Sequence, residues 1–567
     1  MKWIFRESNP ALIETLIRDL SLSPQVARIL SHRGISLPET AQAFLHHGLK
    51  DLPSPFLFKD MKKAVDRLIH AITAKEKITI YGDYDVDGTV GTSILVRFFQ
   101  EIGYPVHFYI PHRLREGYSL NKEALKTLHA TGSQIIITVD NGASAIDDIT
   151  FAKQLGLDVI ITDHHELPPQ WPDAFALINP LRPDNEHPDK YLCGSGVAFH
   201  LIMGLRQSLR EIGFFSQKPE PNLRKYVDLV ALATVADVVP LKGVNRILVK
   251  EGLRIMPHTA WQGLKALIDI SLIDDKITSG HLGFRLGPRL NACGRLYDAA
   301  TGVRLLTTDS IQEAKTLAIE LDTANRERQE IEKQILIEAQ ALLEKENLPE
   351  RLGLVLYQEH WHPGVIGIVA SRIVEQTSRP VILLGREKEN LKGSGRSFGK
   401  FNLVEALREC APFLKKFGGH KAAAGVTLTL ESFVNFREQF DQAVKKHLTP
   451  EECHPFLMID EKLDPTQWNT DLWEELKTLE PFGSGNSEPV FTLSHITPSQ
   501  SRLMGSEKQH IKFKLDKLPF IEATGFQMAH QFSNSTVFNL AFYLRENTFR
   551  GNTSKYLHLK DVQIPSL

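Results

Sequence analysis

The sequence has few cysteines and no long hydrophobic run. Its four cysteines, Cys193, Cys293, Cys410 and Cys453, lie far apart in a chain of 567 residues, so they predict neither a disulfide framework nor a zinc knuckle. The opening stretch "MKWIFRESNPALIETLIRDL" lacks the apolar core of a signal peptide, and no segment approaches the length of a membrane span. We therefore expect buried free thiols in a reducing compartment and a cytoplasmic protein.

The sequence also lacks an excess of charge of either sign. It has 66 Lys and Arg against 68 Asp and Glu, and hydrophobic residues make up 42%. This composition is typical of a globular protein, and the length allows several domains. Because the net charge is only -2, overall charge gives no argument for nucleic-acid binding, and basic regions must be sought locally.

Short apolar runs alternate with helical patterns between residues 78 and 180. The runs are "ITIYGD", "VHFYIP", "QIIITVD", "DVIITDHH" and "FALINP". Apolar strands separated by helices predict a mostly parallel sheet covered on both faces. The fold class that we expect for this part is therefore α/β.

The rest of the chain divides into further patterns. Residues 222–241 are mostly apolar and predict a buried helix, with Asp237 near its end. Residues 310–347 contain no Gly or Pro and predict a long helix that connects domains. A second strand–helix–strand pattern covers about 350–450, and short strand-like runs after Pro455 favour a small β-barrel or sandwich.

Three aspartates follow the first apolar run, in "GDYDVDG". Asp83, Asp85 and Asp87 match early positions of a calcium-binding EF-hand loop, but the twelfth position is Ile94 where a Glu is required. An EF-hand is therefore excluded. Capping of the following helix, which we expect to begin near Thr89, is the simpler alternative.

Two other runs end in the same kind of residue. Asp140 follows "IIITV", and Asp163, His164 and His165 follow "VIIT". The carboxyl ends of parallel strands share one edge of a sheet, so these groups are expected to converge. Two charges ~4 Å apart repel by ~4 kcal/mol at an effective dielectric near 20. Mn²⁺ or Mg²⁺ would remove this repulsion, and a two-metal site suits phosphoryl displacement.

The motifs "GDYDVDG", "VDNG", "DHH" and "ATVADVVP" resemble those of the DHH phosphoesterase superfamily. With "PRLNACGR", "HPGVIGIVASRI", "SGRS" and "GGHKAAAG", the chain from about residue 50 onward is similar to the RecJ family of single-strand-specific exonucleases. The resemblance implies a parallel-sheet DHH phosphoesterase domain, a long connecting helix, a smaller α/β DHH-associated domain that binds nucleic acid, and an OB-fold β-barrel. After an N-terminal segment, 1–50, these parts would span 51–307, 308–348, 349–450 and 455–567.

The same resemblance implies the site residues. The catalytic set would be Asp83, Asp85, Asp140, His164, His165 and Asp237, and all but His165 would ligate the two Mn²⁺ or Mg²⁺ ions. Packing as a supporting imidazole is the alternative for His165. We expect Asp87 to cap its own helix, with a contact to a ligand through water as the alternative. We expect Asp163 to orient an imidazole. Tyr81 departs from the family, whose members often carry a histidine there.

Expected nucleic-acid contacts are Arg113, Arg115, Arg289, Arg295, Ser371, Arg372, Ser394, Arg396, Gly419 and His420. One guanidinium group can donate two hydrogen bonds to two oxygens of a phosphate, which favours arginine at such sites. A surface salt bridge is the alternative for any one of these arginines. Residues 501–520 hold five Lys or Arg against two acids, which indicates either strand binding or a protected sheet edge. Phe513 and Phe520 are expected in the core.

The resemblance implies a metal-dependent exonuclease that degrades single-stranded DNA from 5′ to 3′ in recombination and repair. Single-strand-binding protein and repair helicases would be its partners. Two alternatives are a DHH hydrolase of short oligonucleotides or cyclic dinucleotides, and a non-catalytic single-strand-binding replication scaffold. The additional C-terminal domain argues against the first, and the complete ligand set argues against the second.

Overall fold

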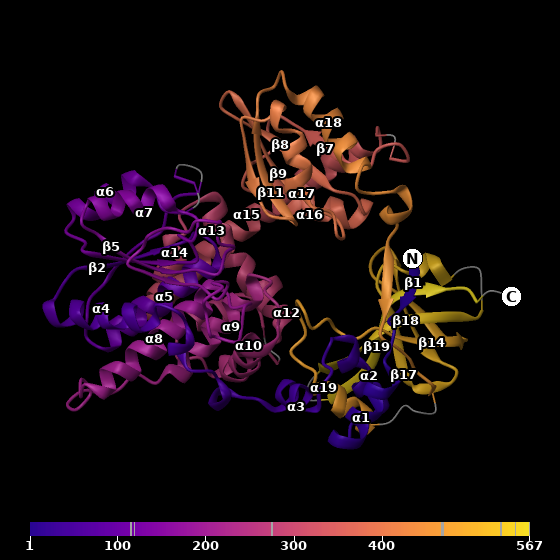
Figure 1. The fold of residues 1–567 in the computed structure, drawn as a ribbon. Helices are drawn as coiled ribbons and strands as arrows, with labels where there is room; N and C mark the ends of the chain where they lie inside the picture. The colour runs from indigo at the N-terminus through magenta and orange to yellow at the C-terminus, as the bar shows by residue number, and fades with distance from the viewer. Residues whose placement is uncertain are drawn as a thin grey trace.

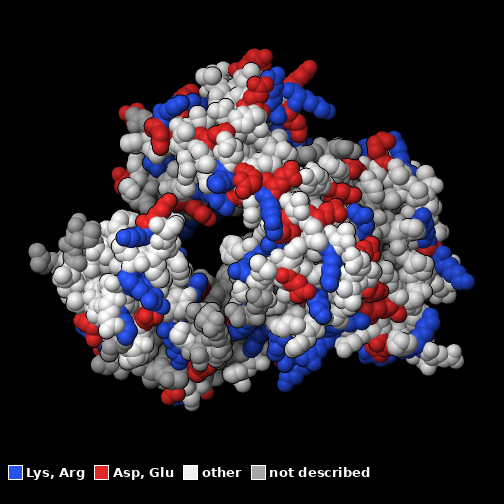
Figure 2. Space-filling view, turned by 180° about the vertical axis from the view of Figure 1, so that it is seen from behind, with Lys and Arg blue, Asp and Glu red and all other residues white. Residues whose placement is uncertain are grey.

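The structure is a computed structural model that describes residues 1–567 except 114–115, 118, 274–275, 347, 466–469, 533–535, 550–551 and 566–567. It contains three bodies (Figure 1), and the space-filling view shows an opening between them (Figure 2). We call them the parallel-sheet body (residues 61–307), the mixed-sheet body (354–445) and the terminal body (1–46 with 456–565). In the part of the chain described, no helix is long and apolar enough to cross a membrane.

The parallel-sheet body is built on five strands in the order β3-β2-β4-β5-β6, all parallel. Alternate residues of the strands face opposite layers: Ile78 and Ile80 pack toward α4, α5 and α8, whereas Tyr81 packs toward α6 and α7 (Figure 1). The α/β prediction is therefore confirmed. The elements are β2 Ile78–Gly82, β3 His107–Tyr109, β4 Ile135–Val139, β5 Asp158–Thr162, β6 Ala176–Ile178, α4 Met61–Ala74, α5 Val86–Glu101, α6 Lys122–Ala130, α7 Ile146–Gln154 and α8 Gly194–Glu211.

Further helices complete this body and lead out of it. They are α9 Val227–Ala236, α10 Gly243–Ile255, α11 Gln262–Ile270, α12 Ser279–His281, the π-helix η5 Leu282–Leu286, α13 Gly287–Leu296 and α14 Ala300–Thr307. The predicted long helix is α15, Ile311–Leu343. Its first half shares the core of the parallel-sheet body, and its second half enters the core of the mixed-sheet body. The helix therefore connects the two bodies.

The mixed-sheet body has five strands in the order β10-β11-β9-β8-β7, of which only the β7–β8 pair is parallel. The strands are β7 Leu354–Tyr357, β8 Val381–Glu387, β9 Asn390–Arg396, β10 Lys416–Gly419 and β11 Ala423–Leu428. The helices are α16 Ile366–Thr377, α17 Leu403–Glu409 and α18 Phe433–Lys445.

The terminal body joins segments from both ends of the chain (Figure 1). Seven strands follow the order β13-β14-β18-β19-β17-β16-β15, and β1 pairs in parallel with β12. Apolar residues of α1–α3 share one core with the seven-stranded sheet. The elements are β1 Lys2–Phe5, α1 Pro10–Leu20, α2 Pro24–His32, α3 Pro38–His46, β12 Phe456–Ile459, β13 Glu461–Lys462, α19 Thr470–Lys477, β14 Phe491–Ile496, β15 Pro498–Met504, β16 His510–Leu515, β17 Leu518–Gly525, β18 Phe538–Phe549 and β19 Asn552–Gln563.

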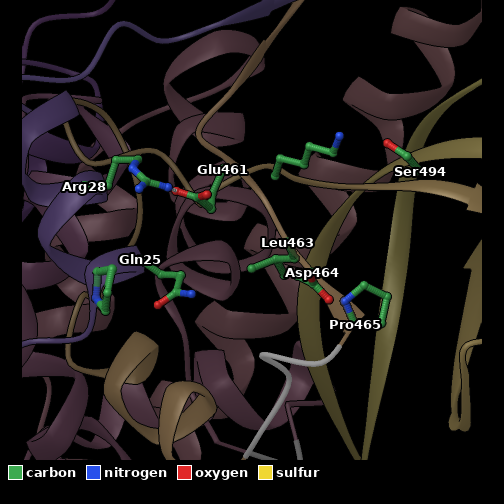
Figure 3. Close-up of a pocket in the computed structure, with 9 residues that line it drawn as sticks. Gln25, Arg28, Glu461, Leu463, Asp464, Pro465 and Ser494 are labelled. Carbon is green, nitrogen blue, oxygen red and sulfur yellow. Dashed lines mark hydrogen bonds and ion pairs between the residues drawn. The ribbon is translucent and has the colours of Figure 1, made fainter. Parts of the chain in front are cut away.

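A cavity of about 390 Å³ lies where α2 meets β13 and β14. Arg28 pairs with Glu461 across it, and Asp464 and Ser494 line it further (Figure 3). Its lining carries charges of both signs and includes none of the residues expected at the metal site. The cavity therefore belongs to the junction of the N-terminal helices with the C-terminal sheet.

Candidate metal centre

Three neighbouring strands and one helix deliver the candidate ligands. Asp83 and Asp85 follow β2, Asp140 follows β4, and His164 follows β5 by two residues. Asp237 is the C-cap residue of the mostly apolar helix α9. Because the three strands are parallel and adjacent, their carboxyl ends bring these side chains to the same edge.

The ligand atoms lie within coordinating distance of common points. Three groups each have all their ligand atoms within 4.8 Å of one another: Asp83, Asp85 and Asp140; Asp140, His164 and His165; and Asp87, His164 and Asp237. His164 Nε2 lies 3.1 Å from Asp140 Oδ1 and 3.6 Å from Asp237 Oδ2. The structure thus brings together all six residues of the expected catalytic set, with Asp87 beside them.

Burial and crowding oppose the charge of these carboxylates. Burial raises the pKa of Asp140 well above its usual value, and the charges of Asp87, Asp85, Asp237 and Asp83 raise it further. The pKa values of Asp83 and Asp237 are raised for the same two reasons. Burial lowers the pKa of His164, so the neutral imidazole, the form that binds metals, is favoured.

Asp163 orients the His165 imidazole, as we expected of it for one imidazole. Its Oδ1 accepts hydrogen bonds from His165 Nδ1 at 2.8 Å and from the His164 backbone N–H at 2.7 Å. Its Oδ2 accepts one from Ala143 N–H. Burial by itself would lower the pKa of His165, but this hydrogen bond and the neighbouring carboxylates raise it to about 9.

The capping roles differ from our expectation. Helix α5 begins at Val86, and Asp85 caps it by accepting from the N–H groups of Asp87 and Gly88 at 2.9 and 3.2 Å. Asp87 instead accepts from the first N–H groups of α8, those of Gly194 and Ser195, at 2.5 and 2.7 Å. The expectation that Asp87 caps its own helix is therefore wrong, because a tertiary contact takes its carboxylate.

Two glycines make the crowding possible. A Cβ atom at Gly88 would lie 2.4 Å from Asp83 N, and one at Gly194 would lie 2.7 Å from the Asp140 Cβ. Tyr81, where the family often has a histidine, donates its hydroxyl to Ser119 O at 3.2 Å. Its ring packs on the α6–α7 face of the sheet. The Tyr81 hydroxyl therefore bonds to the main chain on that face and not to a group at the metal site.

The residues present fit a divalent cation. Within the described part of the chain, the buried atoms Asp83 Oδ1, His164 Nε2 and Asp237 Oδ2 have no hydrogen-bond partner. Buried polar atoms usually have hydrogen-bond partners. These three atoms therefore have free coordination capacity, which a bound cation would use. Hard oxygen ligands with an imidazole suit Mn²⁺ or Mg²⁺.

Arg113, Arg295 and Arg396, which we call the arginine group, lie beside the cluster of carboxylates. Burial lowers the pKa of the Arg295 guanidinium, and the charges of Arg113, Arg328 and Arg396 lower it further, whereas Asp85 raises it. Arg396 Nη1 donates to Ser394 Oγ at 3.0 Å, and Arg295 Nη1 donates to Gly364 O at 3.0 Å. These arginines therefore converge from the parallel-sheet and mixed-sheet bodies next to the carboxylates.

Other expected contacts lie in different surroundings. Arg289 pairs with Asp322 of α15 at 2.9 Å, and Arg372 pairs with Glu332 of the same helix at 2.5 Å. The Ser371 hydroxyl donates to Gly367 O. Gly419 has a φ of 141°. Burial lowers the pKa of the neighbouring His420, and Arg396 and His165 lower it further, whereas Glu166 raises it. The closeness of Glu166 and His165 places His420 toward the parallel-sheet body. Arg115 lies outside the described residues.

Sequence reasoning missed His362. This half-buried side chain has its pKa lowered by burial and by Arg113, and a Cβ atom at Gly364 would lie 3.0 Å from its ring. His362 therefore lies beside the arginine group. Its position at the start of "HPGVIGIVASRI", a motif used only for classification, was the available signal.

The two phenylalanines of the C-terminal basic stretch separate. Phe513 is 1% exposed, as expected, but Phe520 is 70% exposed, so the core expectation for Phe520 is wrong. Lys512 and Lys514 lie on β16, which is paired on both sides by β15 and β17. The edge strand next to β16 is β15, and β13 forms the opposite edge of the sheet.

Comparisons with known proteins place these features in context. The sequence matches the DHH family N-terminal domain over residues 77–234, the DHHA1 domain over 352–446 and the RecJ OB domain over 459–561. It is 38% identical to the single-stranded-DNA-specific exonuclease RecJ of Bacillus subtilis over 91% of this chain and 64% of that protein. With the Escherichia coli exonuclease of the same name it shares 37% identity, over 97% of both chains.

Solved structures agree with the sequence comparison. The crystal structure of RecJ from Thermus thermophilus in complex with Mn²⁺ covers all of this chain with a TM-score of 0.85 and 32% identity, over 80% of its own length. The corresponding Mg²⁺ complex has a TM-score of 0.78 and 31% identity, over 79% of its length. The cluster of acids and imidazoles described above fits a divalent-metal site, in agreement with these Mn²⁺- and Mg²⁺-bound structures.

Proposed function

The chain belongs to the RecJ family of the DHH superfamily, and on this basis we propose that it is a metal-dependent exonuclease that degrades single-stranded DNA from 5′ to 3′. The observation that carries the proposal is the convergence of Asp83, Asp140 and Asp237, which are far apart in sequence, at a place where the buried atoms Asp83 Oδ1, His164 Nε2 and Asp237 Oδ2 have no hydrogen-bond partner. A carboxylate-rich site for two divalent ions is suited to phosphodiester hydrolysis.

In this proposal Asp83, Asp85, Asp140, His164 and Asp237 hold two divalent ions. The ions supply Lewis-acid activation of water and neutralise charge that develops on the phosphate. Asp163 fixes His165 through Nδ1, which leaves Nε2 to donate a hydrogen bond to a phosphate oxygen. Asp87 keeps the start of α8 against Asp140, so it positions a ligand without being one.

We assign the terminal phosphate of the strand to the arginine group beside the metals. Arg113, Arg295 and Arg396 lie close enough for their charges to interact, and Gly367 near the start of α16 packs against Ser394 and Arg396. Guanidinium groups and a helix N-terminus both favour a phosphate dianion. A pocket that requires a terminal phosphate explains why digestion would begin at a strand end.

The terminal body supplies a surface for the rest of the strand. Rings of His510, Phe526, His558 and Tyr543 follow one another, with successive centroids 5.3, 5.3 and 6.3 Å apart. Lys560 lies 5.2 Å from the Tyr543 ring. Rings flanked by cations are suited to stacking with bases of single strands, and this series is the part of the OB domain that we propose contacts the strand.

The wider setting of the proposal is DNA recombination and repair in the cytoplasm. Single-stranded DNA is the substrate, and single-strand-binding protein and repair helicases are the proposed partners. The division proposed for the chain is a DHH domain over 51–307, the connecting helix, a DHH-associated domain over 349–450 and an OB domain over 455–567. The N-terminal segment packs with the OB domain.

The test is digestion of oligonucleotides that carry a label at the 5′ or the 3′ end, single-stranded or paired, with Mn²⁺, Mg²⁺ or EDTA. We expect metal-dependent loss of the single strand that starts at a phosphorylated 5′ end. Asp140→Ala should abolish cleavage and retain strand binding. Digestion in EDTA, loss from the 3′ end, or full activity of Asp140→Ala would each contradict the proposal.

A further inference from the structure

Two apolar side chains next to the metal centre are left in solvent. Val238 directly follows Asp237 and is 68% exposed, and Phe284 is 86% exposed. Large apolar side chains are normally buried, so an exposed pair beside a reaction centre indicates contact with a ligand.

The backbone holds both side chains outward. Val238 has a φ of 61°, a left-handed conformation that is strained for a β-branched residue. Phe284 lies in the middle of the π-helix η5, a rare element that is frequent at functional sites. Leu282 and Leu286 of η5 are fully buried, and Arg285 Nη1 donates to Leu272 O at 3.0 Å. Because its neighbours are anchored, Phe284 cannot turn into the core.

Contacts on either side define where the pair lies. A Cβ atom at Gly283 would lie 3.6 Å from Val235, and one at Gly287 would lie 3.2 Å from the Ala236 Cβ, so η5 packs on the end of α9 that carries Asp237. On the other side, the Ser279 hydroxyl of α12 donates to Phe482 O. The segment from α12 to η5, which carries Phe284, therefore lies between the Asp237 end of α9 and the terminal body, and α12 faces that body in Figure 1.

We propose that Phe284 is a stacking site for one unpaired nucleobase of the substrate strand on its way from the metal centre to the terminal body, and that Val238 adds an apolar contact along the same path. This inference rests on the proposed function and extends it to single-strand selectivity. Stacking on an aromatic ring uses the flat face that every base has. A base within a duplex already stacks on its neighbours, so only an unpaired base is free to occupy the site.

The first test compares Phe284→Ala and Phe284→Trp with the unmodified protein. For Phe284→Ala we expect kcat/KM on a single-stranded oligonucleotide to fall about 5- to 150-fold, the range that corresponds to one lost base–aromatic stack. Phe284→Trp should retain activity. The control is Val434→Ala, which truncates a 64% exposed side chain on α18 and should leave kcat/KM unchanged. Equal activity of Phe284→Ala and the unmodified protein would overturn the proposal.

The second test uses oligonucleotides in which a single abasic site is moved stepwise from the 5′ end. At one position the abasic site should lower the digestion rate of the unmodified protein. The same abasic site should not lower the rate of Phe284→Ala further, because both changes remove the same contact. Independent effects at every position would overturn the inference while metal-dependent digestion, and hence the proposed function, still stands. An unmodified protein that neither binds nor digests the intact oligonucleotide would overturn both.

Discussion

At the scale of single residues, the crowded carboxylates should make the metal-free protein sensitive to pH. The pKa of Asp140 is raised in the folded state, so the stability it contributes is lost as pH rises above its ordinary value of 3.8. Asp140→Asn removes this charge. In EDTA, urea unfolding between about pH 5 and pH 8 should therefore show the variant gaining stability over the unmodified protein as pH increases.

Saturating Mn²⁺ should reverse this order. A ligand present at 100 times its Kd stabilises the folded state by ~2.7 kcal/mol, and Asp140→Asn loses most of that gain. If the unmodified protein remained the more stable in EDTA across the range, charge repulsion would not be the dominant property of the cluster.

Asp87 gives a second prediction at this scale. Asp87→Ala leaves the buried N–H groups of Gly194 and Ser195 without their acceptor, which should lower the free energy of unfolding by about 1–3 kcal/mol. Asp147→Ala is the matched control, since Asp147 is an exposed acid in the first turn of α7 and should change stability by less than about 0.5 kcal/mol. Equal effects in urea unfolding would refute the capping of α8 by Asp87.

At the scale of elements, buried carboxylates of α15 form ion pairs with both of the bodies that the helix connects. Asp322 pairs with Arg289 of the parallel-sheet body, and Glu332 pairs with Arg372 of the mixed-sheet body. Glu332 has a 2% exposed side chain and pairs with Arg328 of its own helix and Arg372 of α16. Glu332→Gln should destabilise the protein by about 3–5 kcal/mol, because two cations lose a buried counter-charge. Glu330→Gln, on the exposed face of the same helix, should have little effect in the same thermal or urea unfolding measurement.

Periodicity in the sequence is enough to predict these elements, but not the fate of each arginine. The apolar strands and the Gly-free stretch of α15 indicate their own structure. Arg289 and Arg295 belong to one motif, yet Arg289 pairs with Asp322, whereas Arg295 lies near Arg113 and Arg396 beside the carboxylates. The difference arises because Asp322 of α15, a helix distant in sequence, lies beside Arg289. No local sequence pattern predicts this contact.

The error at Phe520 had a local signal, unlike the arginines. In β17, Ile521 and Ala523 are buried, so alternation along the strand places Phe520 and Glu522 on the opposite face. The π-helix η5, which positions Phe284, had no such signal. Asp237 likewise required the family resemblance, because an acid at the end of an apolar helix is compatible with several roles.

At the scale of the whole molecule, Arg246 of α10 connects the parallel-sheet body with the terminal body. It is 3% exposed and donates to the carbonyl oxygens of Phe44, Thr478, Leu479 and Glu480 at 2.7–3.0 Å. Its guanidinium lies 3.7 Å from the centre of the Phe44 ring. One basic side chain therefore holds segments from both ends of the chain.

Arg246→Lys should loosen this junction. A lysine keeps the charge but cannot span the four carbonyl oxygens, so we expect a loss of at least about 1.5–3 kcal/mol and a larger radius of gyration by small-angle scattering. Arg254→Lys, on the exposed side of α10, is the control. An unchanged radius for Arg246→Lys would indicate that other contacts hold the bodies together.

The parallel pairing of β1 with β12, and the core that α1–α3 share with the C-terminal sheet, affect how the protein is made. A ribosome adds about 5–20 residues per second. Helices α1–α3 therefore leave the exit tunnel roughly 20–80 s before the strands that cover their apolar sides are synthesised. During that interval a growing chain carries an incomplete core at its leading end, which makes this segment a natural client for chaperones that bind nascent polypeptides.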